Sequence, residues 1–208
     1  MSIRVRQHVN PLKSNFFVIA PDEVVVTPGV PLEVELGSAE AWFLMDRARE
    51  APAGHYVGVE IRRELVDKAN EESARRGLPQ VQSVYANMSV DLPRLFQPGR
   101  VPRFHINFPD PWWKSKQQKR RVIGPSLIEG LWGLLDKDGE VHVATDIFEL
   151  ALDAMAALES EVPRRFRNLR APWSFLPASP FGARSRREVQ CEGEGTRIWR
   201  LAYRRVEG

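Results

Sequence analysis

The sequence predicts a doubly wound α/β fold with a mostly parallel sheet and helices on both of its faces. Apolar runs alternate along the chain between strand-like and helix-like periods, which is typical of such a sandwich. The composition is globular, with 43% hydrophobic and 27% charged residues, and no repeat or low-complexity tract interrupts it. Because 208 residues bury one substantial core but not two, we expect a single domain over 1–208, with 1–29 as an N-terminal extension and 30–208 as the core.

The first half of the chain predicts three strands separated by two helices. Gly37 ends the first strand and Glu60 the second, while Gly77 and Pro79 stop the second helix. In chain order we expect a strand over 31–37, a helix over 40–49, a strand over 55–60, a helix over 63–76 and a strand over 81–85.

The second half continues this alternation and then becomes irregular. Pro125 and Ser126 favour the start of a helix, because proline suits the first helical turn. A loop over 171–183, punctuated by prolines, comes before the closing strand. In chain order we expect a strand over 103–107, a helix over 125–135, a strand over 140–145, a helix over 148–158 and a strand over 197–204.

Basic residues gather in two stretches of the chain. The net charge is only +3, but residues 103–121 carry +5 and residues 160–208 carry +6. Twenty-four of the 30 basic residues are arginine, whose planar guanidinium binds phosphate bidentately and stacks on bases. A polyanionic partner is therefore indicated for 103–121. For 160–208 a solvated basic face is an equally good interpretation.

The sequence lacks the features of several protein classes. No apolar run reaches the length of a membrane span, and residues 1–10 lack the apolar region of a signal peptide, so we expect a cytoplasmic protein without a membrane partner. Cys191 is the single cysteine and is interpreted as an inert thiol. The four histidines show no metal-ligand spacing, so no metal is expected, and His105 and His142 are interpreted as hydrogen-bonded core residues.

Polar residues follow several of the predicted strands. In doubly wound sheets ligands bind beyond the carboxyl ends of the strands. We expect Asn87, Asp110 and Asp146 to lie there, together with Gly37 and Glu60. Gly37 allows a tight turn, and Glu60, 23 residues later, can hold both hydroxyls of a ribose. This spacing indicates a nucleoside-containing cofactor, but it does not separate a nicotinamide dinucleotide from S-adenosylmethionine.

The most specific segment of the sequence is 107–121. Pro109 and Pro111 flank Asp110, which fixes the backbone around this carboxylate and presents it stiffly at a strand end. Two tryptophans and five basic residues follow directly, and a solvated loop does not explain this combination. The basic residues are Lys114, Lys116, Lys119, Arg120 and Arg121.

The segment 107–121, together with Asp146 in Ala-Thr-Asp, resembles the signature of the tRNA (guanine-N7-)-methyltransferase family. That signature is F-P-D-P-W followed by a lysine and a K-R-R cluster, and the similarity extends from Leu32 to about Tyr203. The resemblance implies a seven-stranded, Rossmann-like class I methyltransferase fold. It also implies S-adenosylmethionine as the methyl donor and a guanosine in the variable loop of tRNA as the acceptor.

The resemblance also implies roles for individual residues. Asp110 would be the catalytic acidic residue. The donor would be contacted by Glu35, Gly37, Glu60, Asn87 and Asp110; the substrate by Lys114, Asp146, Ser185, Arg186, Arg187 and Glu188; and the RNA by Lys116, Lys119, Arg120 and Arg121.

Two alternatives stay open at this point. Ala39 and Ala41 stand where the family has the second and third glycines of G-x-G-x-G, which motivates an RNA-binding protein on the same fold with little or no methyl transfer. The spacing from Gly37 to Glu60 alone motivates a nicotinamide-dependent oxidoreductase, although the phosphate-binding fingerprint is missing. The sequence leaves open the oligomeric state, the need for a partner subunit and the tRNAs that are modified.

Overall fold

The alternating apolar runs fold into strands and helices that follow one another along most of the chain. The structure is a computed structural model that describes residues 20–111, 123–160 and 164–207. The strands are β1 (Leu32–Leu36), β2 (His55–Glu60), β3 (Val81–Tyr85), β4 (Val101–Asn107), β5 (Leu135–Thr145), β6 (Phe166–Asn168) and β7 (Trp199–Arg205). The helices are α1 (Trp42–Glu50), α2 (Arg63–Arg75), α3 (Leu92–Leu95), α4 (Pro125–Leu134), α5 (Phe148–Glu159) and α6 (Arg186–Glu194).

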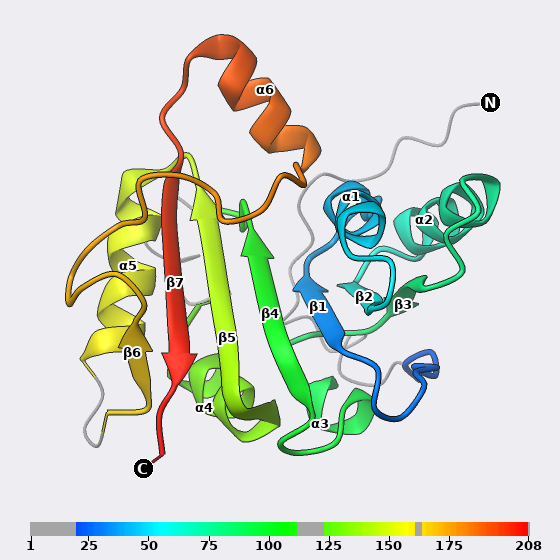
Figure 1. The fold of residues 1–208 in the computed structure, drawn as a ribbon, viewed down its shortest axis with the longest axis horizontal. Coiled ribbons are helices and arrows are strands. Elements are labelled where there is room, and N and C mark those ends of the chain that lie inside the picture. The colour runs from blue at the N-terminus through cyan, green and yellow to red at the C-terminus, as the bar shows by residue number, and fades with distance from the viewer. Residues whose placement is uncertain (1–19, 112–122, 161–163, 208) are drawn as a thin grey trace.

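Within the described residues the strands form one seven-stranded sheet in the order β3-β2-β1-β4-β5-β7-β6 (Figure 1). Strands β1 to β5 pair in parallel, whereas β7 is antiparallel to both β5 and β6. The predicted fold class is confirmed. The chain winds outward from β1 to β3 and then returns to β4 on the other side of β1, so the switch point lies between β1 and β4, where doubly wound folds bind their ligands.

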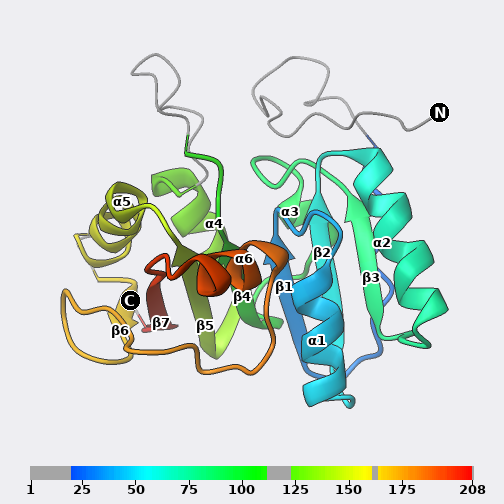
Figure 2. The same cartoon turned by 90° about the horizontal axis from the view of Figure 1, so that it is seen from above.

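Helices cover both faces of the sheet (Figure 2). The larger core cluster joins the sheet to α3, α4 and α5, and the smaller one joins it to α1 and α2. Side chains alternate between the two faces along β1: Val34 lies in the larger core, while Glu33 and Glu35 are on the α1 face. The α1 face therefore carries buried carboxylates close to the switch point.

Helix α6 was not predicted from the sequence, which indicated irregular structure before the closing strand. Ser185 is the N-cap residue of this helix: its hydroxyl accepts a hydrogen bond from the Glu188 N–H at 3.2 Å. Strand β5 is also longer than expected. It begins at Leu135, which pairs with Val101 across a shift in register, so residues 136–139 are part of the strand rather than a loop.

The described part of the N-terminal extension, 20–29, contacts the β3 side of the sheet. The Asp22 carboxylate accepts two hydrogen bonds from the Arg63 guanidinium and one from the Tyr85 N–H, all at 2.8 Å. The Gln82 side chain donates to the Glu23 carbonyl and accepts from the Val25 N–H. These contacts fix the segment along the edge strand.

Candidate functional site

The turn between β1 and α1 has an unusual backbone. Gly37 has φ +77°, and Ala39 and Ala41 have φ +48° and +55°, so two residues with a Cβ adopt the left-handed conformation that favours glycine. The turn packs closely on β2: the Gly37 N–H donates to the Val59 carbonyl at 2.8 Å. A Cβ at Gly58 would lie only 2.3 Å from the Ser38 hydroxyl, so the close approach requires glycine there.

Glu60 ends β2 directly beside this turn. Its buried carboxylate accepts hydrogen bonds from the N–H groups of Ala39 and Ile61, both at 2.9 Å. The Arg62 guanidinium binds the same carboxylate through Nε and Nη2, at 2.8 Å each. Burial lowers the pKa of Arg62, but its hydrogen bonds to Glu60 and the charges of Glu60, Asp110 and Glu40 raise it overall, so Arg62 lies in the combined field of these acidic groups.

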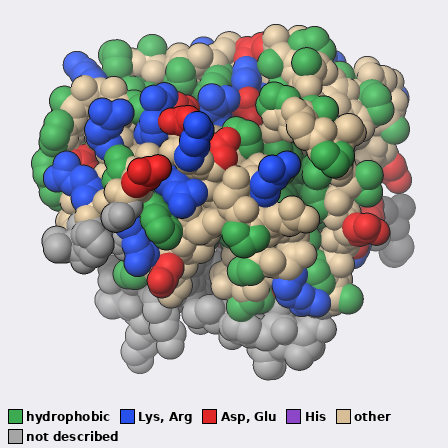
Figure 3. Space-filling model, turned by 60° about the horizontal axis from the view of Figure 1, so that its bottom comes forward, with side chains coloured by type: hydrophobic (Ala, Val, Ile, Leu, Met, Phe, Trp, Pro, Cys, Tyr) green, Lys and Arg blue, Asp and Glu red, His purple; other side chains and the backbone are tan. Residues whose placement is uncertain are grey.

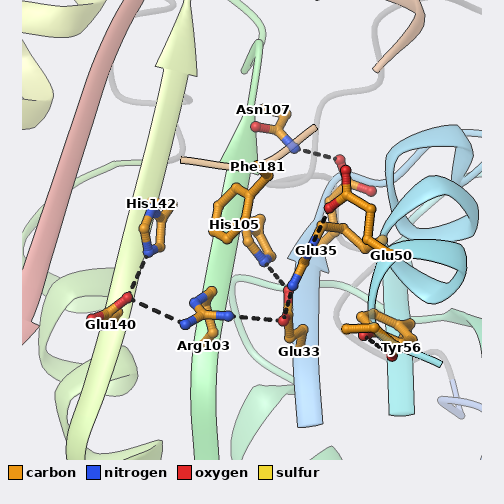
Figure 4. A network of polar contacts seen from close by, with 12 residues as sticks. Glu33, Glu35, Glu50, Tyr56, Arg103, His105, Asn107, Glu140, His142 and Phe181 are labelled. Atoms are coloured by element: carbon orange, nitrogen blue, oxygen red, sulfur yellow. Dashed lines mark hydrogen bonds and ion pairs between the residues drawn. The ribbon is translucent and has the colours of Figure 1, made fainter. Parts of the chain in front are cut away.

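Glu35, on the adjacent strand β1, has a buried carboxyl group with one unused oxygen. Its Oε1 accepts a hydrogen bond from the Asn107 side chain at 2.9 Å, while Oε2 has no hydrogen-bond partner among the described residues (Figure 4). Burial, reinforced by the charge of Glu60, raises the pKa of Glu35 to about 8 in spite of the Asn107 hydrogen bond. Glu35 is therefore mostly protonated at neutral pH until a cationic group comes close.

Asn87 and Asp110 follow β3 and β4 at the same edge of the sheet. Asn87 is fully buried and caps the turn after β3, with its side-chain oxygen accepting from the Ser89 N–H at 3.0 Å. Before Asp110 the chain is strained: Phe108 has φ +50°, and its N–H donates to the Ala144 carbonyl at 2.7 Å. A left-handed aromatic residue is rare, and backbone strain of this kind gathers at functional sites.

Helix α6 lies over the carboxyl edge of the sheet (Figures 1 and 2). The Arg186 guanidinium pairs with Glu40 at 2.5 Å and stacks on the Trp42 ring at 4.5 Å, which connects α6 to the turn after β1. The Arg187 guanidinium pairs with Asp146, the residue that follows β5, at 2.5 Å. The first turn of α6 is thus fastened to both sides of the switch point.

Glu188 connects α6 to strand β7. Its buried carboxylate pairs with the Arg200 guanidinium of β7 at 2.5 Å. Cys191 is buried in the same helix, and burial raises the pKa of its thiol, in agreement with the interpretation of an inert cysteine.

A buried polar network supports the site from the α1 face (Figure 4). The Arg103 guanidinium bridges Glu33 and Glu140, while His105 and His142 hydrogen-bond to these carboxylates at 2.8 and 2.9 Å. Burial lowers the pKa of His105 to about 4, so its ring is neutral at physiological pH. Both histidines are hydrogen-bonded core residues, as the sequence predicted. Figure 3 shows the molecule with the bottom of the Figure 1 view turned forward, and on this face basic and acidic side chains are interspersed.

The structure brings most of the predicted site residues to one edge. Near or just beyond the carboxyl ends of β1 to β4 lie Glu35, Gly37, Glu60, Asn87 and Asp110. Asp146 contacts the predicted substrate element 185–188 through Arg187. Lys114, Lys116, Lys119, Arg120 and Arg121 lie outside the described residues, as do both tryptophans of that segment.

Several interaction partners of these residues were not predicted from the sequence. Arg62 binds Glu60, Asn107 donates to Glu35, Glu40 and Trp42 contact Arg186, and Arg200 pairs with Glu188. Only Arg62 had a usable signal, because it follows the strand-ending carboxylate by two positions.

Neither a metal cluster nor a membrane-spanning helix is found in the part of the chain that the structure describes. In 20–111, 123–160 and 164–207 no group of three or more His, Cys, Asp or Glu side chains could hold a metal ion. No helix in those ranges is long and apolar enough to cross a membrane.

Comparison with known proteins relates the chain to methyltransferases. Residues 30–201 match the model of a family described as "Putative methyltransferase". A tRNA (guanine-N(7)-)-methyltransferase of Synechococcus sp. (strain JA-3-3Ab) is 37% identical over 95% of this chain and 84% of that relative. One from Thermosynechococcus vestitus is 34% identical over 99% and 96%.

Solved structures show the same fold at low identity. The aminoglycoside resistance methyltransferase NpmB1 superposes with a TM-score of 0.54 at 15% identity, over 85% of this chain and 87% of that one. A SAM-dependent O-methyltransferase from Thermotoga maritima superposes with a TM-score of 0.56 at 17% identity, over 86% and 60%.

Proposed function

This chain belongs to the tRNA (guanine-N7-)-methyltransferase family, and from that premise we propose that the carboxylates at the edge of its sheet direct methyl transfer to N7 of a guanosine in the variable loop of tRNA. One observation carries the placement of the site: a buried, unused oxygen of Glu35 lies on the strand next to Glu60, at the switch point of the sheet. S-adenosylmethionine, the donor, supplies an electrophilic methyl group on a sulfonium.

The residues at the switch point fit such a donor. Glu60 would accept hydrogen bonds from both ribose hydroxyls, which requires them to replace the Arg62 guanidinium. Glu35 would accept from the ammonium group of the donor's methionine part, and that positive charge would return the Glu35 carboxyl to its ionised form. Asn87 would accept from the adenine amino group, and the turn 37–41 would line the methionine part.

The acceptor requires positioning more than proton transfer. Guanine N7 already carries an in-plane lone pair, so no proton has to leave before attack, and alignment with the methyl group supplies most of the rate enhancement. The Asp110 carboxylate would accept hydrogen bonds from the N1–H and N2–H edge of guanine and stabilise the positive charge that develops on the ring. The left-handed backbone at Phe108 and the prolines on either side of Asp110 would hold this carboxylate in place beyond the end of β4.

The second half of the edge would hold the rest of the acceptor. Asp146 and the first turn of α6, 185–188, would contact the target nucleotide, and the pairing of Arg187 with Asp146 would exchange for a pairing of Arg187 with an RNA phosphate. Lys114 and the basic residues up to Arg121 would contact the target and its phosphates, a sequence-independent and salt-sensitive contribution.

Replacement of Asp110 by asparagine tests the catalytic role, because it keeps the shape of the side chain and removes its charge. We expect turnover with tRNA to fall about a hundredfold, the size of effect seen when one preorganised electrostatic group is lost. Asp67→Asn, a change of the same kind on the exposed side of α2, is the control and should leave turnover unchanged. Near-full turnover by Asp110→Asn would remove Asp110 from the mechanism.

The alternative of an RNA-binding protein without methyl transfer rested on Ala39 and Ala41. The structure bears on it directly, because both alanines adopt the left-handed conformation that favours glycine, and the Ala39 N–H donates to the Glu60 carboxylate. Calorimetry with S-adenosylmethionine separates the two functions, since absent donor binding alongside intact tRNA binding would favour the non-catalytic one. The oxidoreductase alternative is not supported, because the chain belongs to a family of methyltransferases.

A further inference from the structure

Three aromatic side chains cluster at the carboxyl edge of the sheet, next to the proposed acceptor site. The Phe148 and Trp199 ring centroids are 4.5 Å apart, those of Phe175 and Trp199 4.9 Å, and those of Phe148 and Phe175 6.2 Å. Phe148 begins α5 two residues after Asp146, and Trp199 begins β7 opposite Thr145. We call Phe148, Phe175 and Trp199 the aromatic platform. Phe148 is 43% exposed, which is high for a ring of this size.

Two arginines flank the aromatic platform without a carboxylate partner among the described residues. The Arg197 guanidinium stacks over the Trp199 ring at 3.9 Å from its centroid. The Arg170 guanidinium donates to the Phe175 carbonyl at 2.6 Å. By contrast, the arginines of α6 and β7 described above are each paired with a glutamate or aspartate. The platform therefore combines exposed aromatic surface with positive charge that no acidic side chain in the described part of the chain neutralises.

Both arginines belong to 160–208, the basic stretch whose role the sequence left open between RNA binding and a solvated face. An aromatic face beside uncompensated arginines suits an unstacked nucleotide, since every nucleotide has a base with a π-face and a negatively charged phosphate. Enzymes that act on a base within folded RNA must take it out of the stack, which also exposes the base beside it.

We propose that the aromatic platform binds the base of the nucleotide next to the target guanosine, stacked on Phe148, while Arg197 and Arg170 contact the phosphates on either side. The proposal rests on the proposed function for the identity of the RNA. The arginines of the 160–208 stretch would then bind RNA in addition to the basic residues of 114–121. Phe148 lies two residues after Asp146 in the sequence.

Loss of the Phe148 ring tests the proposal in a binding assay that needs no methyl transfer. We expect the Kd of Phe148→Ala for unmodified tRNA, measured at fixed salt with S-adenosylhomocysteine present, to rise about tenfold, within the range of one base–aromatic stack. Phe148→Trp keeps an aromatic face and should bind as the wild type does. The control Leu152→Ala removes an equally exposed side chain, also 43%, one turn further along α5, and should not change the Kd.

A tRNA with an abasic site beside the target guanosine identifies the occupant of the platform. Abasic sites are placed in turn on the 5′ and the 3′ side. For one of these two tRNAs, wild-type affinity should fall about tenfold, whereas Phe148→Ala should lose no further affinity, because the stack is already absent.

Three results would overturn the proposal. The first is an unchanged Kd for Phe148→Ala. The second is a loss of affinity from the abasic site that adds fully to the loss from Phe148→Ala. The third is a change in the oligomeric state of Phe148→Ala, measured by sedimentation, with its tRNA affinity intact, which would assign the aromatic platform to contact with a second copy of the chain. Failure of the proposed function would be distinguishable. If the affinities follow these expectations but the wild-type protein forms no methylated nucleoside, methyl transfer is contradicted and the proposal for the aromatic platform is not.

Discussion

Replacing Ala39 by glycine should stabilise the protein, although removal of a methyl group usually has the opposite effect. Ala39 has φ +48° and is half-buried. A left-handed conformation costs a residue with a Cβ roughly 1–2 kcal/mol, and glycine relieves this strain. The greater conformational freedom of glycine in the unfolded chain reduces this stabilisation by about 0.4–1 kcal/mol. The net gain is about 0.5–1 kcal/mol, or about 1–4 °C in Tm for a domain of this size.

Two other alanines provide the comparison. Ala41 has φ +55° but is fully buried in the smaller core cluster, so the loss of its methyl group, about 0.8 kcal/mol, should cancel the net gain from relief of strain. Ala156→Gly, on the exposed side of α5, should destabilise by about 1 kcal/mol, as glycine does within a helix. Urea unfolding followed by circular dichroism measures all three variants. If Ala39→Gly lowers the unfolding free energy as Ala156→Gly does, the left-handed turn at 39 is refuted.

Two further predictions concern the donor side of the site. The folded protein holds a proton on Glu35 up to its pKa of about 8, which the unfolded chain releases near 4.5, so Glu35 makes stability fall as pH rises between those values. Glu35→Gln should therefore gain stability relative to the wild type as pH increases from 6.5 to 8.5. This range lies above the one in which His105, with its pKa of about 4, makes stability rise with pH. If the Tm curves of the two proteins run parallel, the burial of this proton is contradicted. Gly58→Ala should destabilise the protein by about 1–3 kcal/mol and weaken donor binding, because the added Cβ would clash with Ser38. Adding Ser38→Gly to this variant should restore both stability and donor affinity. A Gly58→Ala protein with wild-type donor affinity would show that the turn does not depend on the close approach of Ser38 to Gly58.

The sequence predicted the central strands well because their apolar runs are bounded by clear signals. Glu60 and Asp110 could be placed at strand ends on that basis, and the switch point followed from the alternation of strands and helices. Helix α6 was missed because its glycine and glutamate content gives a weak apolar pattern. Its start was nevertheless indicated by Ser185, a favourable N-cap residue whose hydroxyl accepts a hydrogen bond from the Glu188 N–H.

The contacts between distant residues could not be predicted from one sequence. The hydrogen bond from Asn107 to Glu35 joins residues 72 positions apart, and it depends on the pairing of β1 with β4. The left-handed backbone at Ala39 is equally hidden, because alanine favours right-handed helix and only the surrounding packing imposes the other conformation. Propensity describes the local preference, whereas the site depends on where tertiary contacts override it.

Identification of the methylated nucleoside tests the central claim most directly. The wild-type protein is incubated with labelled S-adenosylmethionine and unmodified tRNA, and the RNA is digested and analysed by mass spectrometry. We expect label in 7-methylguanosine, located in the variable loop. Label in a different nucleoside, or no label while donor and tRNA both bind, would contradict methyl transfer to guanine N7 by this site.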